Sequence, residues 1–312
     1  MMTTLRPFRF GLVLPNASSK EDWIAKARRV EELGYAVLLV PDHFGGLFAP
    51  IPALMAAAQA TQSLHIGSLV MDNDFRHPVV LAKESATLDL LSGGRFELGL
   101  GAGWLTSDYE QSGIPLDPAG VRVSRMEESL HILKGLFADG PVTFEGKYYT
   151  VKNLEGMPKP HQRPHPPLLV GGAGKRVLSI AAREADIVSL VARPLPDGSA
   201  LDVTDMSPTA TERKIRVIRQ EAGVRFEELE LNMVLFAVVP TQNRQQEADR
   251  LAGRFQTTGE QLLQTPHCLI GTTEQMCEDL LARRERYGLS YITVFGEHLE
   301  TFAPVVAQLA GR

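Results

Sequence analysis

Short apolar runs alternate with helical patterns along this chain, and within each run the apolar residues are consecutive. The clearest run is residues 36–40, Ala-Val-Leu-Leu-Val, which Pro41 ends. A strand that is apolar on both faces is typical of a parallel sheet that helices cover on each side. In the helical pattern before this run, Trp23, Ala27 and Val30 recur at three- and four-residue spacing. The chain therefore begins with the strand–helix–strand unit of an α/β fold.

The same unit recurs until the chain has supplied eight strands. Eight such strands, alternating with helices, favour a closed (β/α)8 TIM barrel, and we expect residues 1–312 to form one such domain. An open doubly wound sheet is the alternative, but its glycine fingerprint is absent after the first strand. We predict strands at residues 8–14, 36–40, 64–71, 95–100, 167–170, 186–190, 231–239 and 290–295, helices at 79–91, 122–137, 175–184, 211–221 and 274–287, and a last helix that ends at Leu309.

Three stretches interrupt this alternation: residues 139–166, 193–208 and 242–264. They are longer than minimal connections and contain prolines, polar residues or an extra helix. Long barrel loops are usually lids or substrate walls, although surface decoration would also explain them. We expect all three to be insertions into the single domain.

Composition and charge exclude several classes of partner. The net charge of −5 gives no reason to expect nucleic acid or an anionic membrane. No run of about 18 apolar residues predicts a membrane span. The two cysteines, Cys268 and Cys277, fit a reducing compartment better than a disulfide framework. We therefore expect a cytoplasmic protein with a small-molecule substrate.

One candidate site follows the second predicted strand. His43 lies at the carboxyl end of that strand, on the face where barrel enzymes build their sites, and its imidazole could act as acid or base near neutral pH. A histidine that is merely hydrogen-bonded by loop backbone is the alternative. Asp42 could orient the same loop, or it could cap a helix.

Two glycine-rich segments follow later strands. Residues 98–104, Leu-Gly-Leu-Gly-Ala-Gly-Trp, would let the backbone approach a flat ring closely, whereas a tight turn explains three glycines less well. Residues 168–176, Leu-Leu-Val-Gly-Gly-Ala-Gly-Lys-Arg, join a strand to a helix start and suit a phosphate. Ordinary helix capping with exposed basic residues is the alternative. Arg176 stands where a Walker loop has serine or threonine, so the second segment is not a Walker loop.

Other barrel chemistries lack their motifs. The sequence contains no His-x-His pair for a metal-dependent hydrolase and no Gly-x-Ser-x-Gly elbow. We therefore predict no metal site.

The combination of several segments carries a resemblance that covers nearly the whole chain. These segments are Val-Pro-Asp-His-Phe at 40–44, Arg-His-Pro at 76–78, Ala-Thr-Leu-Asp-Leu-Leu-Ser-Gly-Gly-Arg at 86–95, the glycine-rich 98–104, Gly-Thr-Thr-Glu-Gln at 271–275 and Gly-Leu-Ser-Tyr-Ile-Thr-Val-Phe at 288–295. Together they resemble the luciferase-like monooxygenase superfamily. The Asp-His-Phe sequence is most similar to members that use the deazaflavin coenzyme F420, while other members use flavin mononucleotide (FMN).

This resemblance implies an F420-dependent oxidoreductase that transfers a hydride between the deazaflavin and a small, apolar organic substrate. It implies His43 as the catalytic acid or base, and a non-prolyl cis peptide at Leu69–Val70 or one bond later. The implied cofactor-binding residues are Asp42, Leu69, Val70, Met71, Asp72, Gly101, Ala102, Gly103, Ser107, Val170, Gly171, Gly172, Ala173, Gly174 and Lys175. Relatives are commonly dimers, so the resemblance also implies a homodimer.

The chain departs from the F420-dependent sugar-phosphate dehydrogenases of this group. Those enzymes have a tryptophan shortly after Asp-His-Phe and a glutamate at the end of the fourth strand, where this chain has Leu47 and Trp104. We expect both residues to line an apolar substrate pocket. Two alternatives remain: a monooxygenase that uses O2 and reduced FMN from a separate reductase, and a flavin- or deazaflavin-binding protein without turnover.

Overall fold

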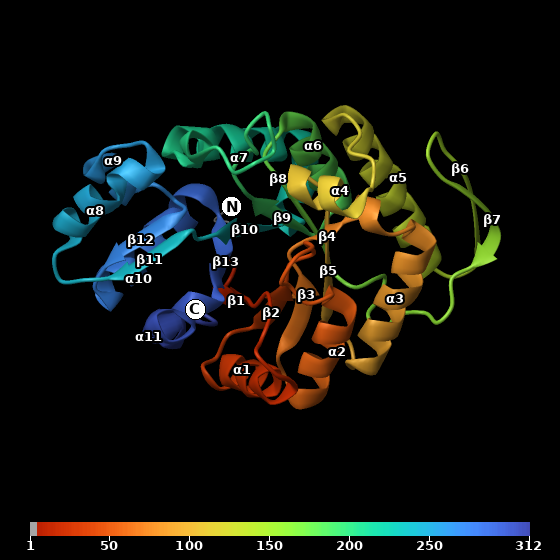
Figure 1. The fold of residues 1–312 in the computed structure, drawn as a ribbon, viewed down its shortest axis with the longest axis horizontal. Helices are drawn as coiled ribbons and strands as arrows, with labels where there is room; N and C mark the ends of the chain where they lie inside the picture. Colours follow the sequence, from red (N-terminus) through yellow and green to blue (C-terminus); the bar gives the residue numbers. More distant parts are fainter. Residues whose placement is uncertain (1–4) are drawn as a thin grey trace.

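A closed barrel of parallel strands forms the centre of the molecule (Figure 1). The computed structural model describes residues 5–312. Nine strands share one sheet; eight form the ring, which closes between β3 and β5, and the two-residue β4 (Met71–Asp72) lies beside β5. The predicted TIM barrel is confirmed. The ring strands are β1 (Arg9–Val13), β2 (Val37–Val40), β3 (His65–Ser68), β5 (Phe96–Gly101), β8 (Leu168–Gly172), β9 (Ile187–Leu190), β10 (Glu230–Val234) and β13 (Leu289–Phe295).

Both faces of the ring strands are buried, as the consecutive apolar runs predict. In β2, Val37 and Leu39 belong to a small cluster inside the barrel, whereas Leu38 and Val40 belong to the large core between barrel and helices. A strand's side chains alternate between its faces, so this division follows from the pleat.

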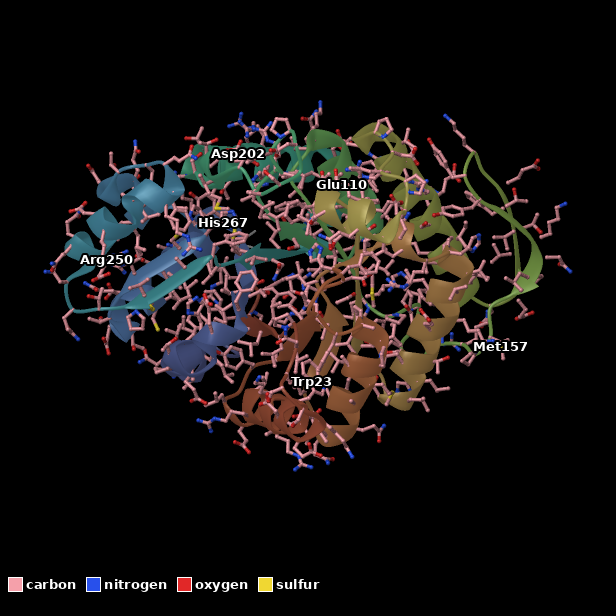
Figure 2. All side chains as sticks on the ribbon, viewed as in Figure 1. Trp23, Glu110, Met157, Asp202, Arg250 and His267 are labelled. Carbon is pink, nitrogen blue, oxygen red and sulfur yellow. The ribbon has the colours of Figure 1, made fainter. Side chains whose placement is uncertain are left out.

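Helices surround the barrel and mostly begin at capping or proline residues. Pro208 occupies the first turn of α7 and Ser207 caps it, so this helix starts three residues before the sequence prediction. The helix predicted from residue 122 likewise begins earlier, directly after Pro118. Trp23 donates its indole N–H to the Ala53 carbonyl and joins the first two helices (Figure 2). The surrounding helices are α1 (Lys20–Glu32), α2 (Pro50–Ala60), α3 (Pro78–Leu91), α5 (Ala119–Phe137), α6 (Lys175–Glu184), α7 (Pro208–Ala222), α10 (Thr273–Tyr287) and α11 (Leu299–Leu309).

The strand predicted at residues 231–239 is wrong as a single element. The chain forms β10 and then leaves the ring as β11 (Ala237–Pro240), which pairs with β12 (Cys268–Gly271) in a separate two-stranded sheet. The backbone N–H of Leu235 still donates to Thr293 in the barrel, whereas that of Phe236 donates to His267 outside it. The apolar run continues without interruption here, so the sequence does not show where the chain stops pairing in the barrel and starts pairing with β12. The 242–264 segment adds α8 (Arg244–Ala252) and α9 (Gly259–Gln264) to this sheet.

The other two interrupting segments differ from each other. Residues 139–166 contain an antiparallel hairpin, β6 (Pro141–Glu145) and β7 (Thr150–Glu155), at the end of the molecule opposite β11 and β12 (Figure 1). Residues 193–208 contain the 3-10 helix η2 (Val203–Met206) and stay near the barrel mouth. The remaining short helices are α4 (Thr106–Ser112), η1 (Asn73–Phe75), η3 (Gly223–Glu228), η4 (Gly253–Phe255) and η5 (Gly296–His298).

Among residues 5–312, no helix combines the length and the apolar character that crossing a membrane requires. Cys268 and Cys277 are buried and not bonded to each other.

Candidate active site at the carboxyl end of the barrel

A cavity of about 550 Å³ opens where the ring strands end. Its walls come from the segments after β2, β3, β5, β8 and β9 and from the first turn of α5. Carboxyl strand ends are the usual place for the active site of a TIM barrel. Most of the site residues expected from the sequence line this cavity: Asp42, His43, Leu69, Val70, Asp72, Gly101, Ala102, Gly103, Trp104, Gly171, Gly172, Ala173 and Gly174.

Four expected residues do not line this cavity. The side chains of Met71 and Val170 are fully buried in the outer core, because their positions in the strands turn them away from the barrel interior. Ser107 lies in the first turn of α4, a short helix that the sequence did not predict. Leu47 is half-buried and does not belong to the residues that line this cavity, so its expected role in the substrate pocket stays a prediction.

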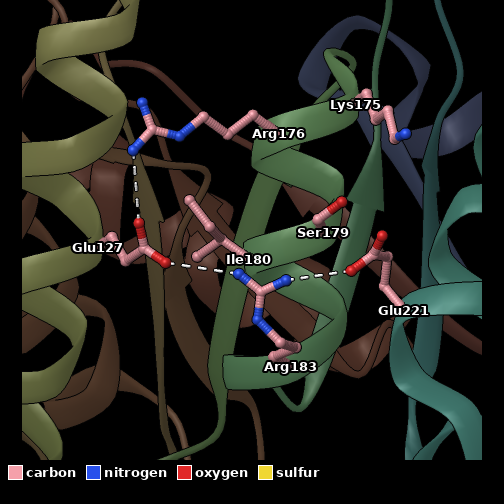
Figure 3. Close-up of a pocket in the computed structure, with 7 residues that line it drawn as sticks. All are labelled: Glu127, Lys175, Arg176, Ser179, Ile180, Arg183 and Glu221. Atoms are coloured by element: carbon pink, nitrogen blue, oxygen red, sulfur yellow. Dashed lines mark hydrogen bonds and ion pairs between the residues drawn. The ribbon is translucent and has the colours of Figure 1, made fainter.

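The fifth exception, Lys175, begins α6 and lies in an outer cleft. That cleft runs between α5, α6 and α7, where Arg183 bridges Glu127 and Glu221 (Figure 3). The next residue, Arg176, lines both this cleft and the cavity. The basic side chain that reaches the cavity from this loop is therefore Arg176.

His43 is held by a carboxylate. Its Nδ1 lies 2.6 Å from Asp108 Oδ2, and Asp108 Oδ1 accepts the backbone N–H of Phe44 at 3.1 Å. A carboxylate only accepts hydrogen bonds, so Nδ1 carries a hydrogen and Nε2 is left to bind a ligand or move a proton. The Trp104 ring stands edge-on to the imidazole, with ring centroids 6.0 Å apart.

Asp42 ties the end of β2 to the segment after β3. It forms a two-point ion pair with Arg76 and accepts the backbone N–H of Asp72 at 3.0 Å. It does not cap α2, whose N-cap residue is Ala49. The capping alternative is therefore excluded, and Asp42 orients the loop that carries His43.

The peptide bond between Leu69 and Val70 is cis, as the resemblance implied. The Val70 side chain packs against three glycines of neighbouring strands. A methyl group added at Gly101 would lie 2.6 Å from Val70 Cγ2, and one added at Gly99 or Gly171 would also contact Val70. These glycines make room for the bulge, a steric reason that differs from the expected approach of backbone to a flat ring.

Glycine is required at position 103 for a different reason. Its φ is +73°, and an added methyl group would lie 1.8 Å from Tyr109 Oη and 2.5 Å from Asp72 Oδ2. Only glycine combines this left-handed conformation with so close a contact. Burial, together with the neighbouring carboxylates Asp74 and Asp42, raises the pKa of Asp72 to about 7.

The side of the cavity formed by α5 and α6 is electropositive. Arg122 donates to the carbonyls of Ala102 and Gly103 and forms no ion pair with any residue of the described chain. Arg176 donates to the carbonyl of Gly120 in the first turn of α5 and also pairs with Glu127 at 3.5 Å, so its charge is partly balanced (Figure 3). The first turns of two long helices and two guanidinium groups therefore converge there, an arrangement that favours an anion.

The 193–208 segment forms the remaining wall. Arg193, Pro194 and Leu201 line the cavity, and the buried Asp205 anchors the segment through the backbone N–H of Arg193 at 3.1 Å. Thr106 Oγ1 donates to the Asp197 carbonyl at 2.7 Å and connects this wall to α4. The expected role of this insertion as a pocket wall agrees with its position.

Sequence reasoning missed several site residues, chiefly Asp108, Tyr109, Arg122 and Arg193. Asp108 and Tyr109 lie in the first turn of α4, shortly after the glycine-rich strand end, and that position could have signalled their proximity to the cavity. Arg122 and Arg193 lie on a helix start and a long loop, where arginines are common and the sequence gives no direction.

Comparisons with known proteins agree with this architecture. A family model described as luciferase-like monooxygenase matches residues 3–257. An F420-dependent glucose-6-phosphate dehydrogenase of Amycolatopsis mediterranei is 32% identical over 173 residues, which cover 53% of this chain and 51% of that protein. An FMNH(2)-dependent dimethylsulfone monooxygenase of Pseudomonas putida is 30% identical over 131 residues, covering 42% of this chain and 36% of that protein. The chain thus spans about half or less of these curated relatives.

The fold is shared with solved structures. An F420-dependent secondary alcohol dehydrogenase, in complex with an F420–acetone adduct, superposes with a TM-score of 0.75 at 20% identity, covering 97% of this chain and 99% of that one. At this identity the likeness concerns the fold alone.

Proposed function

Because the chain belongs to the luciferase-like monooxygenase family, we propose that it is an F420-dependent oxidoreductase that transfers a hydride between the deazaflavin and a small, apolar organic molecule. The observation that carries the proposal is His43, whose Nδ1 is held by Asp108 while Nε2 is left at the cavity. Hydride transfer between an alcohol and a carbonyl carbon is accompanied by proton transfer at the oxygen, and a positioned imidazole supplies that step.

The cavity residues fit such a cofactor at its two chemically different ends. Leu69 and Val70 give an apolar surface for a flat ring. Methyl groups added at Gly120 and Gly174 would meet no atom within 4 Å, so open space adjoins the electropositive helix starts, as a phosphate requires. Arg122 and Arg176 would hold that phosphate.

The protein's own part in the reaction is positioning and proton transfer. When bound, the deazaflavin supplies hydride chemistry. Asp108 fixes the ring of His43, and Nε2 of His43 donates or accepts the substrate proton. Trp104 and Leu201 line the cavity with apolar surface that would exclude water from around a bound substrate.

Apolar walls support a neutral substrate. Trp104, Val123, Val191 and Leu201 line the cavity, and Trp104 occupies the position where the sugar-phosphate dehydrogenases have glutamate. We therefore expect no turnover of sugar phosphates at ordinary rates.

Two alternatives to this function remain. The FMNH(2)-dependent relative favours a two-component monooxygenase that receives reduced FMN from a separate reductase. A cofactor-binding protein without turnover would need only the electropositive side of the cavity. The homodimer, the cytoplasmic location and the single domain stay predictions from the sequence.

Anaerobic assays with purified protein test the proposal. F420 is offered with a panel of small alcohols, and reduced F420 with the matching ketones, while deazaflavin absorbance is followed. We expect turnover with at least one apolar pair. A parallel aerobic assay offers reduced FMN and O2 with the same substrates. Turnover in that assay alone would favour the monooxygenase, and binding without turnover in any assay would favour the non-catalytic protein.

A further inference from the structure

Three carboxyl groups, those of Asp42, Asp72 and Asp74, lie close together near the segment that follows the cis peptide. Two guanidinium groups neutralise only two of them. Asp42 pairs with Arg76, and Asp74 pairs with Arg125 through contacts of 2.8 and 3.0 Å. Asp72 is the third carboxyl. It is 7% exposed and forms no ion pair with any residue between 5 and 312. A buried carboxylate without a cation is costly, so these surroundings favour the neutral acid.

The hydrogen bonds around Tyr109 indicate where the proton of this acid lies. Tyr109 Oη lies 3.0 Å from Asp72 Oδ2 and 3.2 Å from Asp74 Oδ2. A phenol has one hydrogen to donate, and Asp74, whose carboxyl group pairs with Arg125, is the better acceptor. The contact with Asp72 is then favourable if Asp72 itself donates to the phenol oxygen. Arg122 lies 5.9 Å from the centre of the Tyr109 ring and makes its hydrogen bonds to main-chain carbonyls.

Asp72 is also a wall of the cavity. Asp72 and Gly103 are both lining residues, and a methyl group added at Gly103 would lie 2.5 Å from Asp72 Oδ2, so the carboxyl group adjoins the lining there. Asp74 and Tyr109 do not line the cavity. Of the three linked groups, Asp72 is therefore the one that a bound molecule can contact.

We infer that Asp72 is a proton donor to molecules bound in the cavity, distinct from His43, and that Tyr109 and Asp74 control its proton. The inference deepens the proposed function and rests on it, since the donor acts there on a bound substrate or cofactor. In the transfer, one proton moves from the Asp72 carboxyl to an oxygen or nitrogen of the bound molecule. Asp72 becomes a carboxylate, the Tyr109 hydrogen turns from Asp74 to Asp72, and solvent later returns the proton.

The raised pKa of Asp72, about 7, agrees with this role. The first test measures that titration in the protein without ligand, by NMR of 13C-labelled aspartate carboxyl groups. The resonance that disappears in Asp72→Asn belongs to Asp72, and in the unsubstituted protein it should titrate near neutral pH. In Tyr109→Phe it should titrate at higher pH, because the hydrogen bond that the phenol donates to the carboxylate is stronger than the one it accepts from the neutral acid. Tyr148→Phe in the outer hairpin should leave the titration unchanged. Titration of Asp72 in the ordinary carboxyl range overturns the inference.

The second test asks whether the proton is accessible from the cavity. An apolar diazo ester reacts with neutral carboxylic acids: the acid protonates the diazo carbon, nitrogen leaves and an ester forms. Near neutral pH about half of the Asp72 groups would be protonated, against roughly one in a thousand for an ordinary aspartate. Peptide mass spectrometry should find Asp72 esterified at least about tenfold faster than Asp42, as that difference requires. Equal or slower labelling of Asp72 overturns the donor role. Neither test requires cofactor, so a protein that binds neither F420 nor FMN would refute the proposed function without deciding this result.

Discussion

The imidazole of His43 has one nitrogen bound to the protein and one left for a ligand. The sequence pointed to His43 because it follows a buried strand, and strand ends meet at the barrel mouth. It did not identify Asp108 as the partner of His43, because Asp108 lies 65 residues further along the chain in a short helix without a periodic pattern. At the residue scale, positions at strand ends were predictable, whereas their partners from loops were not.

The pair formed by His43 and Asp108 leads to a prediction about the turnover rate. His43→Ala should lower kcat by roughly 100-fold or more, because it removes the proton-transfer group, and should change cofactor affinity little. Asp108→Asn keeps the shape but loses the charge that orients and stabilises the imidazole, so a smaller loss in kcat of roughly 10-fold is expected. Steady-state kinetics and a cofactor titration separate the two quantities.

His77→Ala serves as the control, since His77 caps α3 outside the cavity. Unchanged kcat in His43→Ala would remove this residue from the mechanism.

At the scale of elements, β5 and the bulge after β3 form one structural unit. The sequence predicted that the glycines of 98–104 matter, but it assigned them to a cofactor ring. The structure assigns Gly101 to the space that Val70 occupies, Gly99 chiefly to the close approach of the Ser68 carbonyl, and Gly103 to the contact of Asp72 with Tyr109. The sequence could not separate these reasons, because each depends on side chains from another strand.

Gly103→Ala tests the last of these contacts. Gly113, which ends α4, has a φ of +75° against +73° at Gly103, but an added methyl group there would meet nothing within 4 Å. Gly113→Ala is therefore a matched control for backbone strain. We expect Gly103→Ala to lower the free energy of unfolding by about 1–3 kcal/mol more than the control, through overpacking. Denaturant unfolding of both variants measures this, and equal losses would contradict the contact.

At the scale of the whole molecule, the barrel was predictable because buried parallel strands impose consecutive apolar runs. The excursion through β11 and β12 was not, because a strand that leaves the ring is as apolar as one that stays. The two ends of the barrel also differ. At the amino end of β1, Arg9 pairs with Glu97 on β5 and Glu230 on β10, far from the cavity along the strands.

Because the two ends are separate, we predict that substitutions at the amino end change the stability of the protein without changing its affinity for the cofactor. Arg9→Ala leaves the buried Glu97 without its cation and should lower the free energy of unfolding by about 3–5 kcal/mol. Arg29→Ala removes an exposed pair with Glu300 and should lower the free energy of unfolding far less, because solvent screens an exposed ion pair. Both variants should keep wild-type affinity for the cofactor. A large loss of affinity in a folded Arg9→Ala protein would contradict the assignment of the two ends.

The most direct test of the central claim is a binding titration of the protein with F420 and, separately, with FMN in its oxidised and reduced forms, at low and moderate salt. We predict tight binding of F420 alone, weakened by salt because Arg122, Arg176 and the helix starts would hold an anion. A preference for reduced FMN would contradict the deazaflavin assignment and favour the two-component monooxygenase.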